Sequence, residues 1–209
     1  MLDNKLGLKS NVALAEAEER LTKQRAKELY DSGLIEQIEV GTYRGLAQIH
    51  HFLFQDIYDF AGQQRKVNLA KGNFRFVPVM YLHNALASID NLPQASFDDI
   101  IAKYVEMNVA HPFREGNGRA TRIWLDLLLK ESLGQVIHWP GVNPEDYLLA
   151  MERSPVRSTE IKTIIFQVLT NDINNRDIYM KGIDQSYAYE GYQLYQTADL
   201  GGREKESRP

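Results

Sequence analysis

Apolar residues recur at helical spacing along most of the chain. Residues 11–33 are rich in Ala, Glu, Lys and Arg and follow Ser10, a favourable capping residue. This pattern predicts a surface helix that ends at Gly33. From Thr42 onward, apolar residues repeat at intervals of three and four positions, which predicts a second helix with one buried face that stops near Gly62.

The period changes over residues 66–80, where KVNLAKGNFRFVPVM contains two short runs rich in Val and Phe. The residues between these runs, Lys71, Gly72 and Asn73, are typical of a turn, so the segment predicts a β-hairpin. Pro78 cannot donate a backbone hydrogen bond, which places its strand at an edge. Unpaired backbone groups at such an edge can bind another chain.

Helical patterns return in the second half of the chain. Ser96 can cap a helix that closes before Pro112, because the residue before a proline disfavours helical geometry. His111 is then expected at the C-terminus of that helix. The next helix begins near Asn117 and is apolar on most sides, which predicts a central position in the domain. Further helices are expected over three ranges, 144–152, 158–171 and 184–197.

Length and composition fit one domain. The chain of 209 residues is 44% hydrophobic and 25% charged, as in an average globular protein, and shows no internal repeat or linker. We therefore predict a single all-α domain with one β-hairpin over residues 1–209, with 201–209 as a flexible tail. No apolar run approaches the roughly 20 residues of a spanning helix. We expect no membrane partner and a cytoplasmic protein, or one delivered elsewhere by a route that the sequence does not show.

Charge and cysteine content narrow the functional classes. The formal net charge is -4, which argues against a nucleic-acid partner, because coating a phosphate backbone needs a net basic face. The chain has no cysteine. This excludes disulfides, thiolate catalysis and Cys-based zinc sites. A local basic pocket for a small phosphate compound is compatible with this composition.

The stretch HPFREGNGRATR, residues 111–122, concentrates the candidate chemistry. The amides of residues 116–118 converge at a predicted helix N-terminus, where unpaired N–H groups and the helix dipole favour an anion. The glycines among them let a phosphate touch the backbone. Arg119 and Arg122 are three positions apart, hence on one helix face, and can clamp further phosphate oxygens.

Two side chains of the same stretch suit catalysis. A lone carboxylate such as Glu115 beside phosphate oxygens is a usual anchor for the magnesium ion that accompanies ATP. His111 has an ordinary pKa that suits a general base near neutral pH. Neither a Walker A motif nor an HExxH zinc motif occurs. Each element alone also has an ordinary structural explanation, but together they predict nucleotidyl or phosphoryl transfer.

The complete stretch resembles the signature of the Fic family, HxFx(D/E)GNGRxxR. It matches at every specified position, namely His111, Phe113, Glu115, Gly116, Asn117, Gly118, Arg119 and Arg122. The resemblance extends through DIYDFAGQQR, residues 56–65, to the hairpin. There it is similar to the family's target-docking flap, with Lys71, Gly72, Asn73 and Phe74. It implies a compact helical domain with one β-hairpin, in agreement with the hydrophobic pattern.

The resemblance also implies an activity, AMPylation, in which AMP passes from ATP to a Ser, Thr or Tyr hydroxyl of a target protein. By this resemblance His111 is the base that deprotonates the hydroxyl, and Glu115 is the magnesium ligand. Asn117 and the amides of its neighbouring glycines are implied to cradle the α-phosphate. Arg119 is implied to bind phosphate, and Arg122 to hold the γ-phosphate.

A second motif lies near the C-terminus. SYAYEG, residues 186–191, fits an amphipathic helix with surface tyrosines, but it also resembles the family's inhibitory motif, (S/T)xxxE(G/N). Ser186, Glu190 and Gly191 stand at the specified positions. The resemblance implies that the 184–197 helix inhibits the enzyme, because Glu190 pairs with Arg122 and keeps ATP out of the productive orientation.

Several alternatives stay open. Glu190 can also activate water against an AMP ester, so removal of AMP is an alternative reaction, with Mg²⁺ or Ca²⁺ setting its direction. Transfer of another phosphate-containing group and a non-catalytic nucleotide-binding module are further alternatives. We also expect the released enzyme to modify tyrosines on or beside the inhibitory helix, namely Tyr187, Tyr189, Tyr192 and Tyr195. The target protein and the association of copies into a homo-oligomer are left open.

Overall fold

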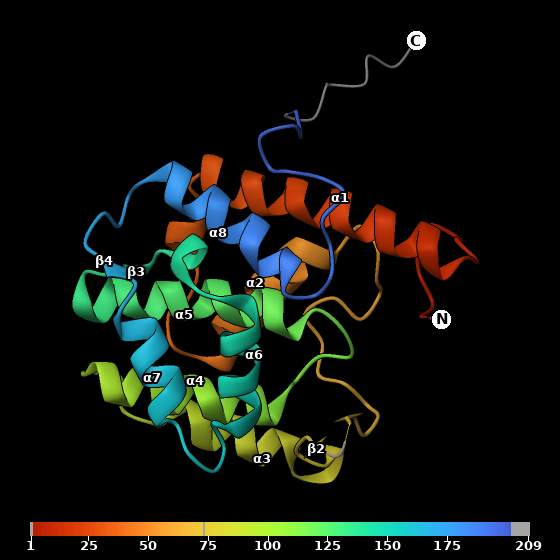
Figure 1. Ribbon diagram of the computed structural model, residues 1–209. Coiled ribbons are helices and arrows are strands. Elements are labelled where there is room, and N and C mark those ends of the chain that lie inside the picture. Colours follow the sequence, from red (N-terminus) through yellow and green to blue (C-terminus); the bar gives the residue numbers. More distant parts are fainter. Residues whose placement is uncertain (1, 73, 202–209) are drawn as a thin grey trace.

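The computed structural model describes residues 2–72 and 74–201 and is mostly helical over them, as predicted (Figure 1). The helices are α1 (Asn11–Asp31), α2 (Tyr43–Phe54), α3 (Val79–Asp90), α4 (Phe97–Ala110), α5 (Asn117–Leu133), α6 (Pro144–Arg153), α7 (Thr159–Phe166) and α8 (Arg176–Ala188). Short antiparallel strands pair as β1 (Ala70–Lys71) with β2 (Phe74–Arg75) and as β3 (Val136–Ile137) with β4 (Leu169–Thr170). Asn73 of the expected flap and residues 202–209 of the expected tail lie outside the described residues.

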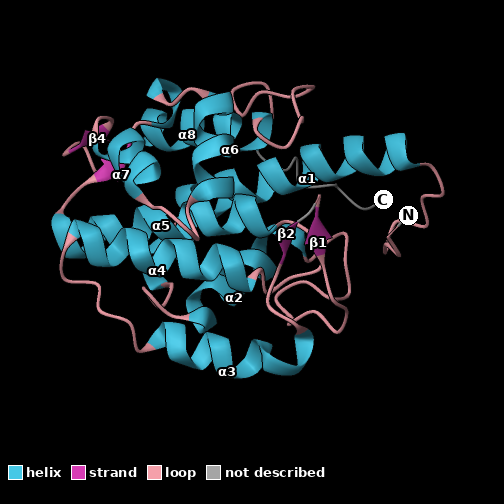
Figure 2. Ribbon diagram, turned by 60° about the horizontal axis from the view of Figure 1, so that its bottom comes forward, coloured by secondary structure: helices cyan, strands magenta, loops and turns pink. Residues whose placement is uncertain are grey.

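Helix α5 forms the centre of the molecule, as its apolar sequence predicts. It contacts α2, α4 and α8, and the side chains of Trp124, Leu125 and Leu128 are fully buried. Helices α1 and α8 lie side by side on one side of α5, and α3 and α4 lie on the opposite side (Figure 1). The two strand pairs lie at opposite ends of the helical body (Figure 2). Among the described residues, no helix is both long enough and apolar enough to cross a membrane.

The helix starts follow local sequence signals. The Ser10 side chain accepts a hydrogen bond from the amide of Ala13 at the start of α1. At the start of α4, Ser96 and Asp99 form a reciprocal capping box. Each cap satisfies backbone N–H groups that have no partner within the helix. These predictions are confirmed because they depend on neighbouring residues alone.

The prediction that Pro78 lies on an edge strand is wrong. The strands of the hairpin cover only residues 70–71 and 74–75, and Pro78 is the N-terminal cap of α3. Its φ of -59° already suits a helix start. Helix α3 was not predicted, because its apolar positions directly follow a run rich in Val and Phe. The proline therefore ends the hairpin and begins a helix.

The predicted helix over 184–197 is also placed wrongly. Helix α8 ends at Ala188, and Gly191 adopts a left-handed φ of 86° beyond its end. The amide of Tyr192 donates to the carbonyl of Tyr187 at 3.1 Å, which closes the helix in a Schellman-type turn. Residues 189–200, which follow the helix, are not helical, and we call them the C-terminal segment. Glu190 lies in this turn rather than on a helix.

Helix α1 is more than a surface helix, because several of its charged residues are buried. The Glu19 carboxylate accepts the backbone N–H group of Tyr195, at 3.1 Å. Lys23 is fully buried and pairs with Glu19 at 3.0 Å and with Asp184 of α8 at 3.4 Å. Buried charges must be paired. The pairing therefore fixes the C-terminal segment along α1.

Candidate active site

The candidate site lies where α4 ends and α5 begins. His111 is the C-cap of α4 and has a φ of 49°, the only positive value for a non-glycine residue within 2–72 and 74–201. Gly116, with a φ of 76°, is the N-cap of α5, so the first amides of α5 point out of the loop. The His111 side chain and these amides line one cleft. This juxtaposition confirms the arrangement predicted from the sequence.

The loop between the two helices is closed by Phe113 and Asn117. The Asn117 side chain accepts from the amide of Phe113 and donates to its carbonyl, both at 2.8 Å. The Phe113 ring is fully buried and anchors the loop in the core. A Cβ atom at Gly116 would lie 2.3 Å from the Phe54 ring, so a glycine is needed there. The Asn117 side chain thus shapes the loop.

His50, on α2, packs against this loop and was not predicted as a site residue. Its ring stacks on Phe113 at 3.8 Å between ring centres. Its Nδ1 accepts the amide of Gly62 at 2.9 Å, so its Nε2 carries the proton that bonds the carbonyl of Glu115 at 2.8 Å. Burial lowers the pKa of His50 to about 3. Its position on the apolar face of α2 is the sequence signal that could have identified His50 as a buried residue.

The His111 imidazole is held in a defined orientation. It stacks on the Phe76 ring, with 3.7 Å between ring centres and 15° between planes. Burial lowers the pKa of His111 to about 4, and a hydrogen bond to the carbonyl of Asn108 opposes that shift. The ring is therefore neutral near pH 7, which is the state that a general base requires.

Arg65 fixes the hairpin relative to His111. Its guanidinium donates to the carbonyl of His111 at 2.8 Å and to that of Ala110 at 3.1 Å, at the end of α4. It also donates to the carbonyls of Val67 and Val77, which lie on the segments that lead into and out of the hairpin. Arg65 is the last residue of the DIYDFAGQQR stretch, and its role depends on carbonyls that the sequence does not place.

Glu115 lies at the edge of the cleft with 41% of its side chain exposed. Its Oε1 accepts the amide of Gly116 at 3.0 Å and the Nη2 group of Arg119 at 3.1 Å. The carboxylate is therefore held in place and still accessible from the cleft. Among residues 2–72 and 74–201, no group of three or more His, Cys, Asp or Glu side chains is arranged to hold a metal ion.

Arg119 does not line the cleft, contrary to the expectation of a phosphate-binding side chain. It is 1% exposed and pairs with Glu18 of α1 at 2.7 Å. Its guanidinium also lies over the rings of Phe54 and Tyr192, at 4.9 and 4.8 Å. The Arg119 side chain thus makes interior contacts with α1 and the C-terminal segment. Sequence alone gave no sign of Glu18 as the partner.

Arg122 is buried and is bound by two residues of the 186–191 motif, Ser186 and Glu190. Its Nε donates to Oγ of Ser186 at 2.6 Å, and its Nη2 donates to the Ser186 carbonyl at 2.8 Å. Nη2 also pairs with Oε1 of Glu190 at 2.9 Å. Burial alone would raise the pKa of Glu190, but Arg122 and Arg119 outweigh it and lower that pKa below its ordinary value. The predicted ion pair between Glu190 and Arg122 is confirmed.

Glu190 lies directly over the start of α5. A Cβ atom at position 118 would lie 2.4 Å from Oε1 of Glu190 and 2.9 Å from Nη1 of Arg122. Gly118 therefore leaves room for this ion pair. The carboxylate occupies the space beside the same amides that would bind an anion.

The cleft above these groups has a volume of about 690 Å³. This is within the range of roughly 300–1,000 Å³ that small-molecule sites occupy. The hairpin and α6 form its walls, with Lys71, Gly72, Phe74, Phe76, Tyr147 and Met151. The expected flap residues within the described ranges are thus brought to the site.

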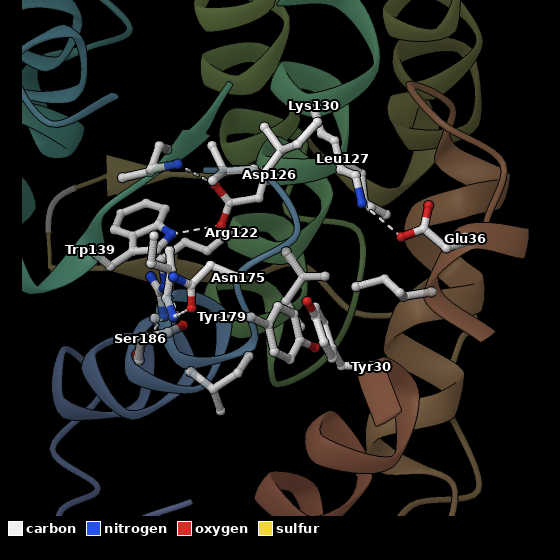
Figure 3. Close-up of a pocket in the computed structure, with 18 residues that line it drawn as sticks. Tyr30, Glu36, Arg122, Asp126, Leu127, Lys130, Trp139, Asn175, Tyr179 and Ser186 are labelled. Carbon is white, nitrogen blue, oxygen red and sulfur yellow. Dashed lines mark hydrogen bonds and ion pairs between the residues drawn. The ribbon is translucent and has the colours of Figure 1, made fainter. Parts of the chain in front are cut away.

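A second, smaller cavity lies behind Arg122, between α5 and α8 (Figure 3). Its volume is about 50 Å³, far less than a nucleotide needs. In Figure 3, Asp126 accepts hydrogen bonds from the indole of Trp139, at 2.8 Å, and from the Ile137 amide, at 2.9 Å. This cavity belongs to the packing of α8 and does not serve as the nucleotide site.

The four tyrosines near Glu190 are buried or have hydroxyl groups that donate hydrogen bonds. Tyr187 is buried and donates to Thr22, and Tyr189 is 8% exposed. Tyr192 and Tyr195 are partly exposed and donate to Glu18 and Glu16. Modification of Tyr187 or Tyr189 therefore requires the C-terminal segment to leave its place.

Comparisons with known proteins identify the family. Residues 41–129 match the model of the Fic/DOC family. A relative named "Probable protein adenylyltransferase Fic" from Salmonella typhimurium is 31% identical over 178 residues, which cover 80% of this chain and 86% of the relative. The chain belongs to the Fic/DOC family. A Fic relative from Escherichia coli with the same name is 30% identical and covers 82% of this chain and 88% of its own length.

Solved Fic structures share the fold. The BepC protein of Bartonella tribocorum, with bound AMPPNP, has a TM-score of 0.68 at 18% identity and covers 81% of this chain and 92% of its own. An N-terminal Fic domain from Bartonella quintana, with bound ADP, has a TM-score of 0.69 at 18% identity, with coverages of 85% and 93%. Helices α1 and α8 lie outside the segment that matches the Fic model.

Proposed function

We propose that this protein is an adenylyltransferase that moves AMP from ATP to a Ser, Thr or Tyr hydroxyl of another protein. The observation that carries the proposal is the convergence of a neutral His111 and the first amides of α5 on one nucleotide-sized cleft. The curated relatives that are named protein adenylyltransferases support it. An intact base in the cleft favours transfer over binding alone.

The reaction follows from the residues of the cleft. His111 removes the proton from the target hydroxyl, whose oxygen then forms a bond to the α-phosphorus of ATP. The bond between that phosphorus and the bridging oxygen breaks, and pyrophosphate leaves with the electron pair. The amides at the start of α5 stabilise charge on the α-phosphate. Arg122 holds the γ-phosphate once Glu190 has left it.

Glu115 fits the role of a magnesium ligand. Its carboxylate is partly exposed at the cleft edge and is oriented by two donors. Magnesium in nucleotide sites is usually held by one or two carboxylates together with substrate phosphates and water, so a single protein ligand is sufficient. A bound magnesium ion supplies positive charge that neutralises the triphosphate. Calcium, which tolerates longer and more numerous bonds, is proposed as an alternative occupant.

We further propose that the structure represents an inhibited state. Glu190 both pairs with Arg122 and covers the space over Gly118. ATP cannot place its γ-phosphate on Arg122 until that pair opens. The protein target is expected to dock on the hairpin, because both residues of β1 are exposed beside the cleft.

Removal of AMP is a second candidate reaction, which the state of Glu190 favours. This carboxylate is ionised at neutral pH, since its pKa lies below the ordinary value, and 31% of its side chain is exposed beside the phosphate site. It can therefore take a proton from an attacking water, whose oxygen bonds to the phosphorus of AMP as the bond to the target oxygen breaks. A protonated His111 would return a proton to that leaving oxygen. Release of AMP from a purified modified target by wild type, and not by Glu190→Gly protein, would support this role.

Labelled ATP and magnesium test the main proposal with wild type, Glu190→Gly and His111→Ala proteins side by side. We expect Glu190→Gly to transfer label to protein at least tenfold faster than wild type. His111→Ala should bind ATP but transfer none, because it loses the base and keeps the phosphate site. Nucleotide that binds to Glu190→Gly protein and is never transferred would contradict the proposal.

A further inference from the structure

A buried guanidinium lies behind the Glu115 carboxylate. Arg119 is 1% exposed, and the rings around it stabilise a cation without neutralising its charge. Two carboxylates lie beside it. Glu18 lies 2.7 Å from Nη1, and Glu115 lies 3.1 Å from Nη2. The same arginine therefore joins a residue of α1 to the proposed metal ligand.

Glu18 is itself held firmly. Its side chain is 2% exposed, and it accepts hydrogen bonds from the hydroxyls of Tyr58 and Tyr192 in addition to its pair with Arg119. A buried carboxylate persists when a cation and several donors satisfy it, and Glu18 has both. Its position, and with it that of the Arg119 guanidinium, is therefore fixed by the packing of α1.

We infer that Glu18 is a positioning residue for the metal–nucleotide site. It compensates Arg119, so that Arg119 orients the Glu115 carboxylate without neutralising it. The inference rests on the proposed function, because it takes Glu115 as the metal ligand. Helix α1 lies outside the segment 41–129 that matches the family model, so this contribution comes from an adjoining part of the chain.

The direction of the effect follows from the charges. With Glu18 ionised, Arg119 has a full counter-charge on the side away from the cleft. With Glu18 replaced by a neutral glutamine, Arg119 would draw on Glu115 for compensation. That tighter pair would compete with the metal ion for the same carboxylate, so metal affinity falls. Supporting residues beyond the direct ligands commonly change metal affinity by about tenfold or more.

Manganese is a suitable probe of this site. It would be titrated with AMPPNP into Glu190→Gly protein, which lacks the carboxylate that pairs with Arg122, and its binding would be followed by electron paramagnetic resonance. The same titration would be made after adding Glu18→Gln, Glu19→Gln or Glu115→Gln. Glu19→Gln is the matched control, because Glu19 is an equally buried neighbour on α1 that pairs with Lys23 instead of Arg119.

We expect the dissociation constant of manganese to rise roughly tenfold with Glu115→Gln, about fivefold with Glu18→Gln and less than twofold with Glu19→Gln. The AMP-transfer rate of the Glu18→Gln protein should return to the parent value at saturating magnesium. A general structural defect would lower that rate at every magnesium concentration.

Three outcomes would overturn the inference. One is a Glu18→Gln dissociation constant within twofold of the parent, and another is an equal rise with Glu19→Gln. If Glu115→Gln changed nothing, the metal ligand of the proposed function would fail as well, which separates the two failures. If Glu18→Gln does not fold, Glu18→Asp decides, because its shorter side chain moves the carboxylate away from Arg119, beyond the 2.7 Å separation of Glu18, and so weakens the counter-charge. A rise above twofold then supports the inference, and no rise overturns it.

Discussion

The Nη2 atom of Arg122 lies 2.9 Å from Oε1 of Glu190, although 68 positions separate the two residues in the chain. This contact joins the start of α5 to the turn that follows α8. It also neutralises a cationic group that lines the cleft, the guanidinium to which the proposed function assigns the γ-phosphate. The consequences can be tested at residues on both sides of the contact.

Ser186→Ala should activate the enzyme in part. The substitution removes the 2.6 Å hydrogen bond from Nε of Arg122 and leaves a buried charged donor unpaired, at a cost of about 1.5–3 kcal/mol. The closed state weakens, and we expect transfer to rise less than with Glu190→Gly. Label transfer and urea denaturation would measure the two effects. Ser88→Ala, which removes a serine hydroxyl bond on α3, is the control and should leave transfer unchanged.

Lys23→Met should activate the enzyme from a distance. Lys23 is fully buried and pairs with Glu19 and Asp184, so its loss leaves carboxylates without a cation and destabilises the chain by about 3–5 kcal/mol. The C-terminal segment then loosens, and Glu190 leaves Arg122 more often.

Lys103→Met is the matched control for that experiment. Lys103 is 1% exposed and donates to the loop that follows α3, away from the C-terminal segment. Both variants should lower the free energy of unfolding, and only Lys23→Met should raise AMP transfer. Equal transfer rates in the two variants would contradict a restraining role for α1.

The pH dependence of transfer should reflect the environment of His111. Burial lowers its pKa to about 4, so the neutral base persists well below pH 6. In Glu190→Gly protein, kcat/KM should change less than twofold between pH 8 and pH 5.5. A histidine with an ordinary pKa would lose about tenfold over that range. Initial rates would be compared at pH values where circular dichroism shows folded protein, and a tenfold loss would rule out the buried, neutral base.

Stability should fall in acid because of His50. Its folded pKa of about 3 lies below the unfolded value of about 6.5, so the unfolded chain binds the proton first as pH falls. The contribution of His50 is complete above pH 6.5 and is lost toward pH 3. Between pH 7 and pH 5 the loss is about 2 kcal/mol.

Urea denaturation at pH 7 and pH 5 would measure this loss. His50→Gln should lessen the fall in stability between pH 7 and pH 5 by about this amount, while His111, whose pKa is lowered to about 4, still contributes to that fall. The variant is less stable than wild type at pH 7. His138→Gln changes an exposed histidine and should keep the wild-type slope. If both variants kept that slope, the acid sensitivity would have to come from other groups.

Local sequence signals were sufficient for part of the site and not for the rest. His111, Gly116 and the start of α5 could be predicted because the proline, the glycines and the helix period act on adjacent residues. The partner of Arg119 could not, since Glu18 lies on α1, and nothing in either neighbourhood indicates that the two meet. Helix propensity also misplaced the end of α8, where the turn geometry available to Gly191 prevailed.

The space left by the missing side chain at Gly118 can be filled either by a phosphate or by the Glu190 carboxylate. A phosphate needs the bare backbone there, and so does the Glu190 carboxylate, which lies where a Cβ atom would be. A methyl group at this position would therefore obstruct both the binding of a phosphate and the contact between Glu190 and Arg122. Under the proposed inhibition, a variant that is active and no longer inhibited must therefore change the C-terminal segment or the residues that hold it, and not Gly118.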